Sequence, residues 1–373
     1  MKLVITGFSN SGKTTVFNAL TGQNLETTTY PTSISADAAP HPGIVKIPDA
    51  RIEKLSLIYE PKKTTYAAVE YIDYLGITSA AAGGDVSQNT KVFNLIKDAD
   101  ALVHVVRAFD DEAVMHPLGN VDPVRDVKSF EAELILGDLE LIEKRLEKIK
   151  DQEKRGKKQD EADKKLLLKC RAALEEENSL RNIVFTAEEK KLLLPYQFLS
   201  TIPEIIVLNI NEADLNSDRA GKYQSDIEAY FRATGQGAAP PVIQLCGKIE
   251  MEIAQLPAEE AKDFLEALGI DEPAMRKLCH VSYDALGLIP FFTVGADEVR
   301  AWTISRGTHA QQAAGKIHSD IERGFIRAEV VGYDDLIASD GDMVRVREKG
   351  LARLEGKTYP VRDGDIINFK FNV

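Results

Sequence analysis

The first part of the chain alternates between short apolar runs and segments with helical spacing. Residues 2–6 are an apolar run that predicts a buried strand, and a glycine-bounded turn then leads to residues 15–20, whose apolar spacing is helical. Further strand-like runs, separated by stretches long enough for crossover helices, are residues 69–73, 101–106, 205–209 and 241–245. The pattern predicts an α/β fold with a doubly wound, mostly parallel sheet.

A polar interval rich in Lys and Glu separates the runs at 101–106 and 205–209. Apolar residues recur in it at spacings of four and three, at Ile135, Leu139, Ile142, Leu146 and Ile149. After a polar break, Leu167, Cys170 and Leu174 continue with similar spacing. We therefore expect an inserted antiparallel helical hairpin. Two separate surface helices packed on the sheet are the alternative, because periodicity identifies an apolar face but not its partner.

From about residue 286 the pattern changes to short strands with one helix. Strands are expected at 291–294, 299–304 and 366–371, and a helix at 310–324. These elements predict a small α+β module. The expected domains are a nucleotide-binding domain at residues 1–127 and 200–283, a helical hairpin at 128–199, and a C-terminal domain at 284–373.

Composition and charge restrict the classes of function. The net charge of −13 argues against sequence-independent binding of nucleic acid, although residues 300–373 alone carry a net charge of +1. The three cysteines are widely spaced, so neither a disulfide framework nor a zinc site is expected. No run approaches the roughly 20 apolar residues that cross a bilayer, so we expect a cytoplasmic protein without a membrane partner.

The segment Gly7-Phe-Ser-Asn-Ser-Gly12-Lys13-Thr14 matches the Walker A pattern between a predicted strand and a predicted helix. Its glycines let backbone N–H groups turn toward phosphate oxygens at a helix N-terminus. Lys13 then reaches the β and γ phosphates, and the Thr14 hydroxyl binds Mg²⁺. The residues expected to bind nucleotide here are Asn10, Ser11, Gly12, Lys13, Thr14 and Thr15.

A second motif, Asp73-Tyr-Leu-Gly76, begins at the end of a predicted strand. P-loop proteins use this spacing to bring a carboxylate to magnesium and a glycine amide to the γ-phosphate. We expect Asp73 to bind the metal, and Lys13 and Gly76 to act in catalysis.

The base is expected to be read where the run at 205–208 continues into Asn209-Ile-Asn-Glu212. GTPases use Asn-Lys-x-Asp there, because the Asp accepts two guanine N–H groups. Here the Lys is absent and Glu212 replaces the Asp, which favours ATP, with Ile210 at the base edge. A shift by two residues gives Asn211-Glu-Ala-Asp214, which could serve guanine, so the register remains open. Cys246-Gly-Lys248 is the expected fifth nucleotide-binding element.

These motifs resemble those of the YchF/Obg-like ATPase family over nearly the whole chain. The most specific stretches are residues 292–304, 312–320, 324–330 and 363–373, together with Pro48-Asp-Ala-Arg51. The resemblance implies a P-loop domain, a helical hairpin and a C-terminal β-grasp (TGS) domain. It also implies a slow Mg²⁺-dependent ATPase that binds the large subunit of the ribosome, with rRNA or ribosomal protein contacted through the TGS and helical domains.

The chain departs from the family pattern in its switches. Ile77 stands where many GTPases have the Gln that orients water, and residues 78–85 lack the usual Gly- and Lys-rich sequence. The first switch, residues 30–43, is longer than in the family, and Thr32 is its candidate magnesium ligand. Asn10 resembles a P-loop Asn that holds K⁺ in related enzymes. Two alternatives to an ATPase are a GTP-dependent translation factor and a nucleotide-gated binding protein with negligible turnover.

Overall fold

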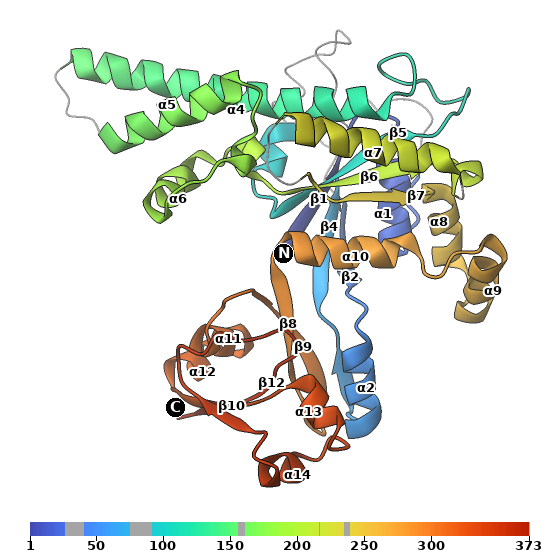
Figure 1. The fold of residues 1–373 in the computed structure, drawn as a ribbon, viewed down its shortest axis with the longest axis vertical. Coiled ribbons are helices and arrows are strands. Elements are labelled where there is room, and N and C mark those ends of the chain that lie inside the picture. The colour runs from blue at the N-terminus through green and yellow to red at the C-terminus, as the bar shows by residue number, and fades with distance from the viewer. Residues whose placement is uncertain (27–40, 75–91, 156–160, 216, 235–238, 373) are drawn as a thin grey trace. The chain divides into compact units, whose positions relative to one another are not determined.

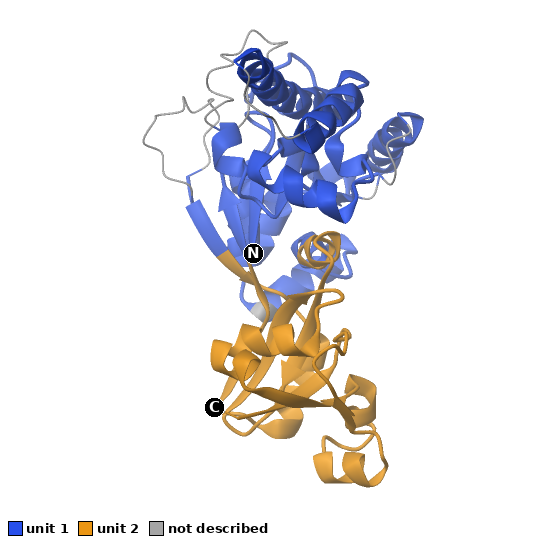
Figure 2. Cartoon of the chain, turned by 90° about the vertical axis from the view of Figure 1, so that its left-hand side faces the viewer, with its two compact units in different colours: residues 1–43, 70–278 blue, residues 44–69, 279–373 orange. Residues whose placement is uncertain are grey.

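The computed structural model describes residues 1–26, 41–74, 92–155, 161–215, 217–234 and 239–372. The chain divides into two compact units (Figure 2). The first comprises Met1–Gly43 and Glu70–Leu278, and the second comprises Ile44–Val69 and Cys279–Val373. Thr32, Gly76 and Ile77 lie outside the described residues.

The first unit is built on a six-stranded sheet of order β2-β4-β1-β5-β6-β7 (Figure 1). The strands are β1 (Lys2–Thr6), β2 (His41–Lys46), β4 (Ala68–Asp73), β5 (Ala101–Ala108), β6 (Glu204–Ile210) and β7 (Val242–Leu245). The pairs β1–β4, β1–β5, β5–β6 and β6–β7 are parallel. Every residue of β5 and β6 is buried, as expected for strands covered on both faces. The predicted doubly wound, mostly parallel sheet is confirmed.

Helices cover both sides of this sheet, with α4 and α7 on one side and α1 and α8 on the other (Figure 1). Helices of this unit outside the hairpin include α1 (Lys13–Thr21), α7 (Asp218–Ala233), α8 (Gly247–Gln255) and α9 (Ala258–Leu268). Helix α10 (Ala274–Ala285) begins in this unit and ends in the second. Apolar side chains of α4 and β1, among them Phe130, Leu134 and Val4, share one buried cluster. This packing fixes the carboxyl ends of the strands, where the predicted site residues lie.

The predicted helical hairpin is formed by α4 (Pro123–Lys154) and α5 (Glu161–Glu175). The Asp122 side chain accepts a hydrogen bond from the Arg125 N–H, and Pro123 occupies the first turn, so the start of α4 is well capped. Ile142 and Ile149 of α4 bury against Leu167 of α5 in a cluster that also contains α6 (Ala187–Leu193). Three short 3₁₀ helices, at Leu180–Asn182, Leu194–Tyr196 and Leu199–Thr201, lead back to β6.

The second unit is a β-grasp-like α+β fold with strand order β11-β10-β12-β8-β9-β3. Its strands are β3 (Lys63–Thr65), β8 (Leu288–Thr293), β9 (Glu298–Ser305), β10 (Phe325–Val331), β11 (Arg353–Glu355) and β12 (Ile366–Phe371). Helix α11 (Ala310–Ile317) packs Ala313 and Ala314 onto Phe291 and Phe369 of the sheet. Three shorter helices are α12 (Ser319–Arg323), α13 (Tyr333–Ile337) and α14 (Met343–Glu348).

The helix predicted at 310–324 is interrupted at His318. This residue has extended backbone angles, φ −162° and ψ 142°, and its ring Nδ1 accepts the Asp320 N–H at 3.1 Å. A side chain that caps the next helix in this way ends the one before it. Two helices, α11 and α12, therefore stand where the apolar spacing predicted one.

Residues 44–69 group with the C-terminal part of the chain. Within this unit, α2 (Ala50–Tyr59) is tied down by Arg51, whose guanidinium pairs with Asp49 and with Asp363 at 2.8 Å. The Tyr59 hydroxyl donates to the Gly341 carbonyl at 2.6 Å, and β3 pairs with β9 in parallel. This division differs from the three predicted domains, which placed residues 44–69 in the nucleotide-binding domain.

None of the helices in the described part of the chain has both the length and the apolar composition that a membrane crossing requires.

Candidate functional site

The predicted phosphate loop joins β1 to α1, and two of its glycines are required by geometry. Gly7 has φ +134°, and a Cβ there would lie 2.4 Å from the Val105 carbonyl oxygen. Gly12 has φ +90°, and a Cβ there would lie 2.2 Å from Nδ2 of Asn209. The first turn of α1 contains no acidic residue. The loop therefore brings backbone N–H groups and the positive end of a helix dipole to one place, which suits an anion.

Lys13 is buried at the start of α1. Its Nζ donates to the Phe8 carbonyl at 2.8 Å, so the side chain lies back across the loop. Burial lowers the pKa of Lys13 to about 8, against the opposing effect of Asp73. A bound phosphate would add negative charge beside this amine and favour its protonated form. An anionic ligand at this loop would therefore stabilise the charged form of Lys13.

Thr14 and Asp73 meet beside the loop, at the end of β4. The Thr14 hydroxyl donates to Oδ2 of Asp73 at 2.8 Å, while Oδ1 of Asp73 is buried without a hydrogen-bond partner. Burial raises the pKa of Asp73, whereas the Thr14 hydrogen bond and the Lys13 charge lower it. A hydroxyl and a carboxylate with an unused buried oxygen fit Mg²⁺, which prefers oxygen ligands and is usually held by few protein groups plus phosphates.

Asn10 connects the phosphate loop to the segment after β5. It has φ 62°, and its side-chain Nδ2 donates to the Met115 carbonyl at 2.9 Å. Ser11 is buried with an unpaired Oγ, and its carbonyl accepts the side chain of Asn209. Thr15 lies in the first turn of α1, where its Cγ2 is 3.4 Å from the position of a Cβ on Gly247.

Sequence reasoning missed the groups that hold the segment after β5. Arg107 donates to the carbonyls of Phe109, Asp111 and Val114 at 3.1, 3.2 and 2.8 Å. His116 Nδ1 accepts the Leu118 N–H, so its Nε2 carries the proton donated to Asp126 at 2.9 Å. These residues support Met115, the partner of Asn10. An arginine inside a largely apolar strand, and a histidine shortly after it, are a signal that could have marked them.

Asn209, at the end of β6, joins two loops. Its Nδ2 donates to the Ser11 carbonyl at 3.0 Å, and its Oδ1 accepts the Gly247 N–H at 2.9 Å. Both groups of its amide are therefore used to hold the phosphate loop against the segment that follows β7. Ile210 and Cys246 are buried, and burial raises the pKa of the Cys246 thiol. The side chain of Glu212 is exposed, in a 3₁₀ turn (Glu212–Asp214).

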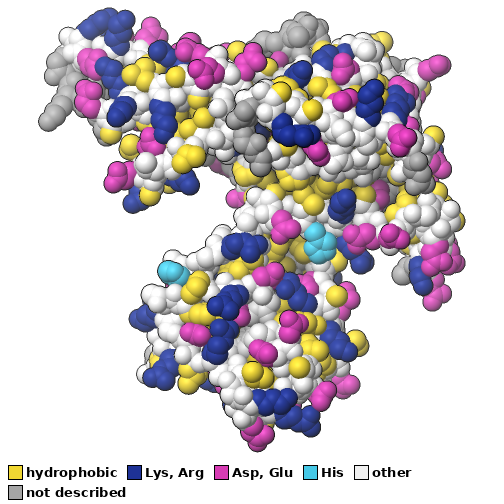
Figure 3. All heavy atoms as spheres, viewed as in Figure 1, with side chains coloured by type: hydrophobic (Ala, Val, Ile, Leu, Met, Phe, Trp, Pro, Cys, Tyr) yellow, Lys and Arg dark blue, Asp and Glu magenta, His cyan; other side chains and the backbone are white. Residues whose placement is uncertain are grey.

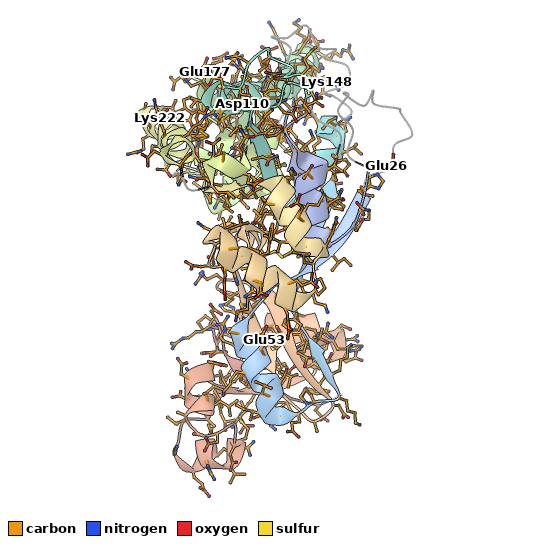
Figure 4. All side chains as sticks on the ribbon, turned by 90° about the vertical axis from the view of Figure 1, so that its right-hand side faces the viewer. Glu26, Glu53, Asp110, Lys148, Glu177 and Lys222 are labelled. Atoms are coloured by element: carbon orange, nitrogen blue, oxygen red, sulfur yellow. The ribbon has the colours of Figure 1, made fainter. Side chains whose placement is uncertain are left out.

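The carboxylate of the shifted register, Asp214, has local partners. It accepts the Ser217 hydroxyl at 3.1 Å and lies 3.6 Å from the Arg219 guanidinium. Arg219 also pairs at 2.7 Å with Asp110, which belongs to the segment after β5. Asp110 is labelled in Figure 4. Asp214 thus stabilises the entry to α7. Asn211, the other residue of this register, precedes the 3₁₀ turn.

A glycine-rich loop that opens a helix, next to a hydroxyl–carboxylate pair at the ends of parallel strands, defines a P-loop nucleotide-binding protein. Two family models match the chain. MMR_HSR1, described as a 50S ribosome-binding GTPase, matches residues 2–136, and YchF-GTPase_C, described as a protein of unknown function (DUF933), matches residues 288–372. The chain belongs to the YchF family.

Relatives of similar length support this membership. The ribosome-binding ATPase YchF of Bacillus subtilis is 42% identical over 369 residues, covering 99% of this chain and 98% of the relative. The corresponding protein of Escherichia coli O157:H7 is 36% identical, covering 100% and 99%. The solved structure of the Schizosaccharomyces pombe YchF GTPase matches with a TM-score of 0.80 and 28% identity, covering 99% of this chain and 97% of that one.

Proposed function

We propose that this chain is a Mg²⁺-dependent ATPase that binds the ribosome in the cytoplasm and turns over slowly. The observation that carries the hydrolase proposal is the contact between Thr14 and Asp73 beside the buried Lys13. The names of the B. subtilis and E. coli relatives, ribosome-binding ATPase, support the nucleotide and the partner.

In this mechanism water attacks the γ-phosphate in line. Lys13, the loop amides and the Gly76 amide stabilise the charge that develops on the transferred group. Thr14 and Asp73 would hold the metal, with Thr32 as a further proposed ligand. When bound, Mg²⁺ neutralises charge on the β and γ phosphate oxygens. Asn10 is the proposed ligand of a K⁺ ion, and equal turnover in sodium and potassium would remove that part of the proposal.

Selectivity for ATP is proposed to rest on the register that starts at Asn209. The two hydrogen bonds of the Asn209 side chain connect the loop that contains Ile210 and the loop that contains Cys246 to the phosphate loop. Glu212 then follows at the base edge, where its longer side chain avoids the repulsion that a fixed Asp would exert on N1 of adenine. The pairing of Asp214 with Ser217 and Arg219 supports this choice, because a carboxylate bound to side chains at the start of α7 is less free to bind guanine.

Ribosome binding is proposed through the C-terminal unit and the helical hairpin, at rRNA or protein of the large subunit. Arg300, Arg306, Lys316, Arg323 and Arg327 are the proposed phosphate contacts. Basic and acidic side chains are interspersed on the visible face of the C-terminal unit (Figure 3). Such a mixed surface favours local contacts over general attraction to nucleic acid.

Titration of nucleotide-free protein with fluorescent ATP and GTP analogues, with and without Mg²⁺, tests the proposal. The wild-type protein is compared with Lys13→Ala and Asp73→Asn, after thermal melts confirm that both variants fold. We expect preference for ATP, at least tenfold weaker binding by Lys13→Ala, and loss of the Mg²⁺ effect in Asp73→Asn. Preference for GTP would move base recognition to Asn211 and Asp214, and absence of phosphate release in a single-turnover assay would make the protein a binding module.

A further inference from the structure

The second unit contains a strand edge that has no partner strand along most of its length. Strands β8 and β12 are central neighbours, but their pairing is confined to Ile366 and Phe292. Two backbone hydrogen bonds flank that pair, from Gly364 to Pro290 at 3.0 Å and from Phe292 to Asp365 at 2.8 Å. Strand β8 ends at Thr293, whereas β12 continues to Phe371. The rest of β12 therefore extends past the end of its neighbour.

The hydrogen-bond pattern of β12 shows which of its residues direct their main-chain groups toward this unpaired edge. Toward β10, β12 is paired along its whole length, including the pairs Asn368–Glu329 and Lys370–Arg327. Because Asp365 directs its carbonyl toward β8, alternation along the strand directs the main-chain groups of Phe369 and Phe371 to the same side. No strand in the described part of the second unit pairs with these two residues on that side.

A hollow of about 340 Å³ lies at this edge. Its lining comes from both faces of the sheet, since Phe369 belongs to the core beneath α11 whereas Glu329 is ion-paired with Arg347 of α14. With β10 occupying the opposite edge of β12, a hollow that reaches both faces opens where β8 is missing. Apolar side chains from the helices and the strand end border it, namely Val294, Ile317, Ile321, Met343 and Phe371.

On the α14 side of the hollow, basic side chains outnumber the one acidic side chain that they contact, Glu329. Glu329 is paired with two cations, with Arg347 at 2.6 Å and with Lys370 at 3.8 Å. The hydrogen bond from Arg347 lowers the pKa of Glu329, so this carboxylate is ionised and cancels only one of the two positive charges. Arg327 lies opposite Lys370 on the neighbouring strand and is exposed. An acidic group in the hollow would therefore be attracted.

We propose that this edge of β12 binds an extended peptide segment of a partner protein, added as a further strand, in which apolar and acidic residues alternate. An unpaired edge recognises a main chain through its N–H and C=O groups, and pockets beside it select alternate side chains. The isoleucines, on the face of α11 and α12, would take the apolar side chains. Arg347 and Lys370, on the face of α14 where Met343 also lies, would take the acidic ones. RNA fits less well, because its phosphates would meet an apolar border and it has no strand of N–H groups for the edge.

The test uses the full-length protein and fluorescein-labelled six-residue peptides in which Val alternates with Glu, followed by fluorescence anisotropy. Three further probes are a peptide with Lys in place of Glu, the acidic peptide with alternate backbone nitrogens methylated, and a single-stranded RNA of twelve nucleotides. Met343→Glu introduces a charge at the hollow. Val344→Glu is the matched control, because Val344 is the next residue of α14, is 58% exposed and does not line the hollow.

We expect the acidic peptide to bind, the Lys peptide and the methylated peptide to bind at least tenfold more weakly, and Met343→Glu to weaken binding at least tenfold. Val344→Glu should stay within twofold of wild type. The proposal is overturned if no peptide binds, if both variants bind alike, or if methylation has no effect. RNA binding that depends on Met343 and displaces the peptide would make the hollow a nucleic-acid site and would overturn it as well. Nucleotide is absent throughout, so the outcome is independent of the ATPase proposal.

Discussion

At the scale of single residues, the site depends on one amide that contacts two loops. Asn209 is 6% exposed and uses both its donor and its acceptor, for Ser11 and Gly247. Gly12 and Gly247 both face it closely, since a Cβ on either would lie 2.2 or 3.1 Å from the amide group. The two glycines and the asparagine thus form one packed unit, in which a larger or missing side chain would displace the phosphate loop.

Replacing Asn209 with Ala is expected to destabilise the protein and weaken nucleotide binding. Two hydrogen bonds of about 0.5–1.5 kcal/mol each are lost, so the free energy of unfolding should fall by about 1–3 kcal/mol. Affinity for nucleotide should fall more than tenfold, because Ser11 and Gly247 lose their common anchor. Urea unfolding and nucleotide titration measure the two effects.

Asn211→Ala is the matched control for the register. Asn211 is partly exposed and begins the alternative motif, so its removal should change stability by less than about 0.5 kcal/mol and leave affinity nearly unchanged. A larger loss of affinity for Asn211→Ala than for Asn209→Ala would show that the base is read two residues later.

The residues that could be predicted are those whose roles are encoded in local sequence. Lys13 and Thr14 follow from the spacing of one loop, and the structure places Asp73 against Thr14. Arg107 and His116 were not predicted, because their partners are backbone carbonyls and a helix residue that only the folded segment brings near. The single sequence also left the base register open, because two overlapping motifs satisfy the same pattern.

At the scale of elements, a buried ionic network connects the hairpin to the sheet. Glu131 of α4 and Glu204 of β6 both accept from Nη1 of Arg181, at 2.8 and 2.7 Å, and Ser179 donates to Glu131 at 2.5 Å. His104 of β5 contacts Glu204 at 2.7 Å, and burial lowers the pKa of this imidazole to about 3, so it is neutral. The two carboxylates thus share one guanidinium. Apolar periodicity predicted the hairpin seam but carries no information about such charges.

This network predicts a pH dependence of stability. Burial, together with the proximity of Glu204, raises the pKa of Glu131 from 4.5 to about 7. Between these values the folded protein holds a proton that the unfolded chain has lost, so the free energy of unfolding falls as pH rises from about 4.5 to about 7. Glu131→Gln imitates the protonated carboxyl. It should lie within about 1 kcal/mol of wild type at pH 5 and be more stable by roughly 1–3 kcal/mol at pH 8.

Urea unfolding of both proteins at pH 5, 6, 7 and 8 measures this difference. The comparison between the two proteins removes the contributions of other carboxylates, which titrate in both. Stability profiles that run parallel across this range would mean that Glu131 stays ionised, with Arg181 compensating its burial.

At the scale of the whole molecule, the two compact units are not contiguous in sequence. The chain leaves the first unit after Gly43, contributes α2 and β3 to the second, and returns at Glu70, three residues before Asp73. The sequence placed this segment in the nucleotide-binding domain, because neighbouring residues are usually assigned together. Strand β3 consists of Lys63, Thr64 and Thr65, which carry no apolar pattern. Its partner, β9, follows more than 230 residues later in the chain, so only the tertiary structure reveals the pairing.

Because α2 is packed within the second unit, it should unfold with that unit. Ile52 and Leu55 are fully buried, and Tyr59 donates to Gly341. Hydrogen exchange of the intact protein at increasing denaturant measures this. Peptides that cover residues 50–59 should open with the same free energy and denaturant dependence as β8 and β9, and differently from β1. Exchange of α2 together with β1 would contradict the assignment.

Two variants of α2 test whether this helix unfolds cooperatively with the second unit. Tyr59→Phe removes the hydrogen bond to Gly341, so it should lower the opening free energy of α2 and of β8 by about 0.5–1.5 kcal/mol and leave β1 unchanged. Leu57→Ala is the control on the same helix, because Leu57 is 75% exposed and should change neither. If Tyr59→Phe lowers the opening free energy of α2 alone, the helix is attached to the second unit without being part of its cooperative fold. A common shift of α2 and β8 would instead make residues 44–69 a structural part of the C-terminal unit, through which the chain passes directly before the strand that ends at Asp73.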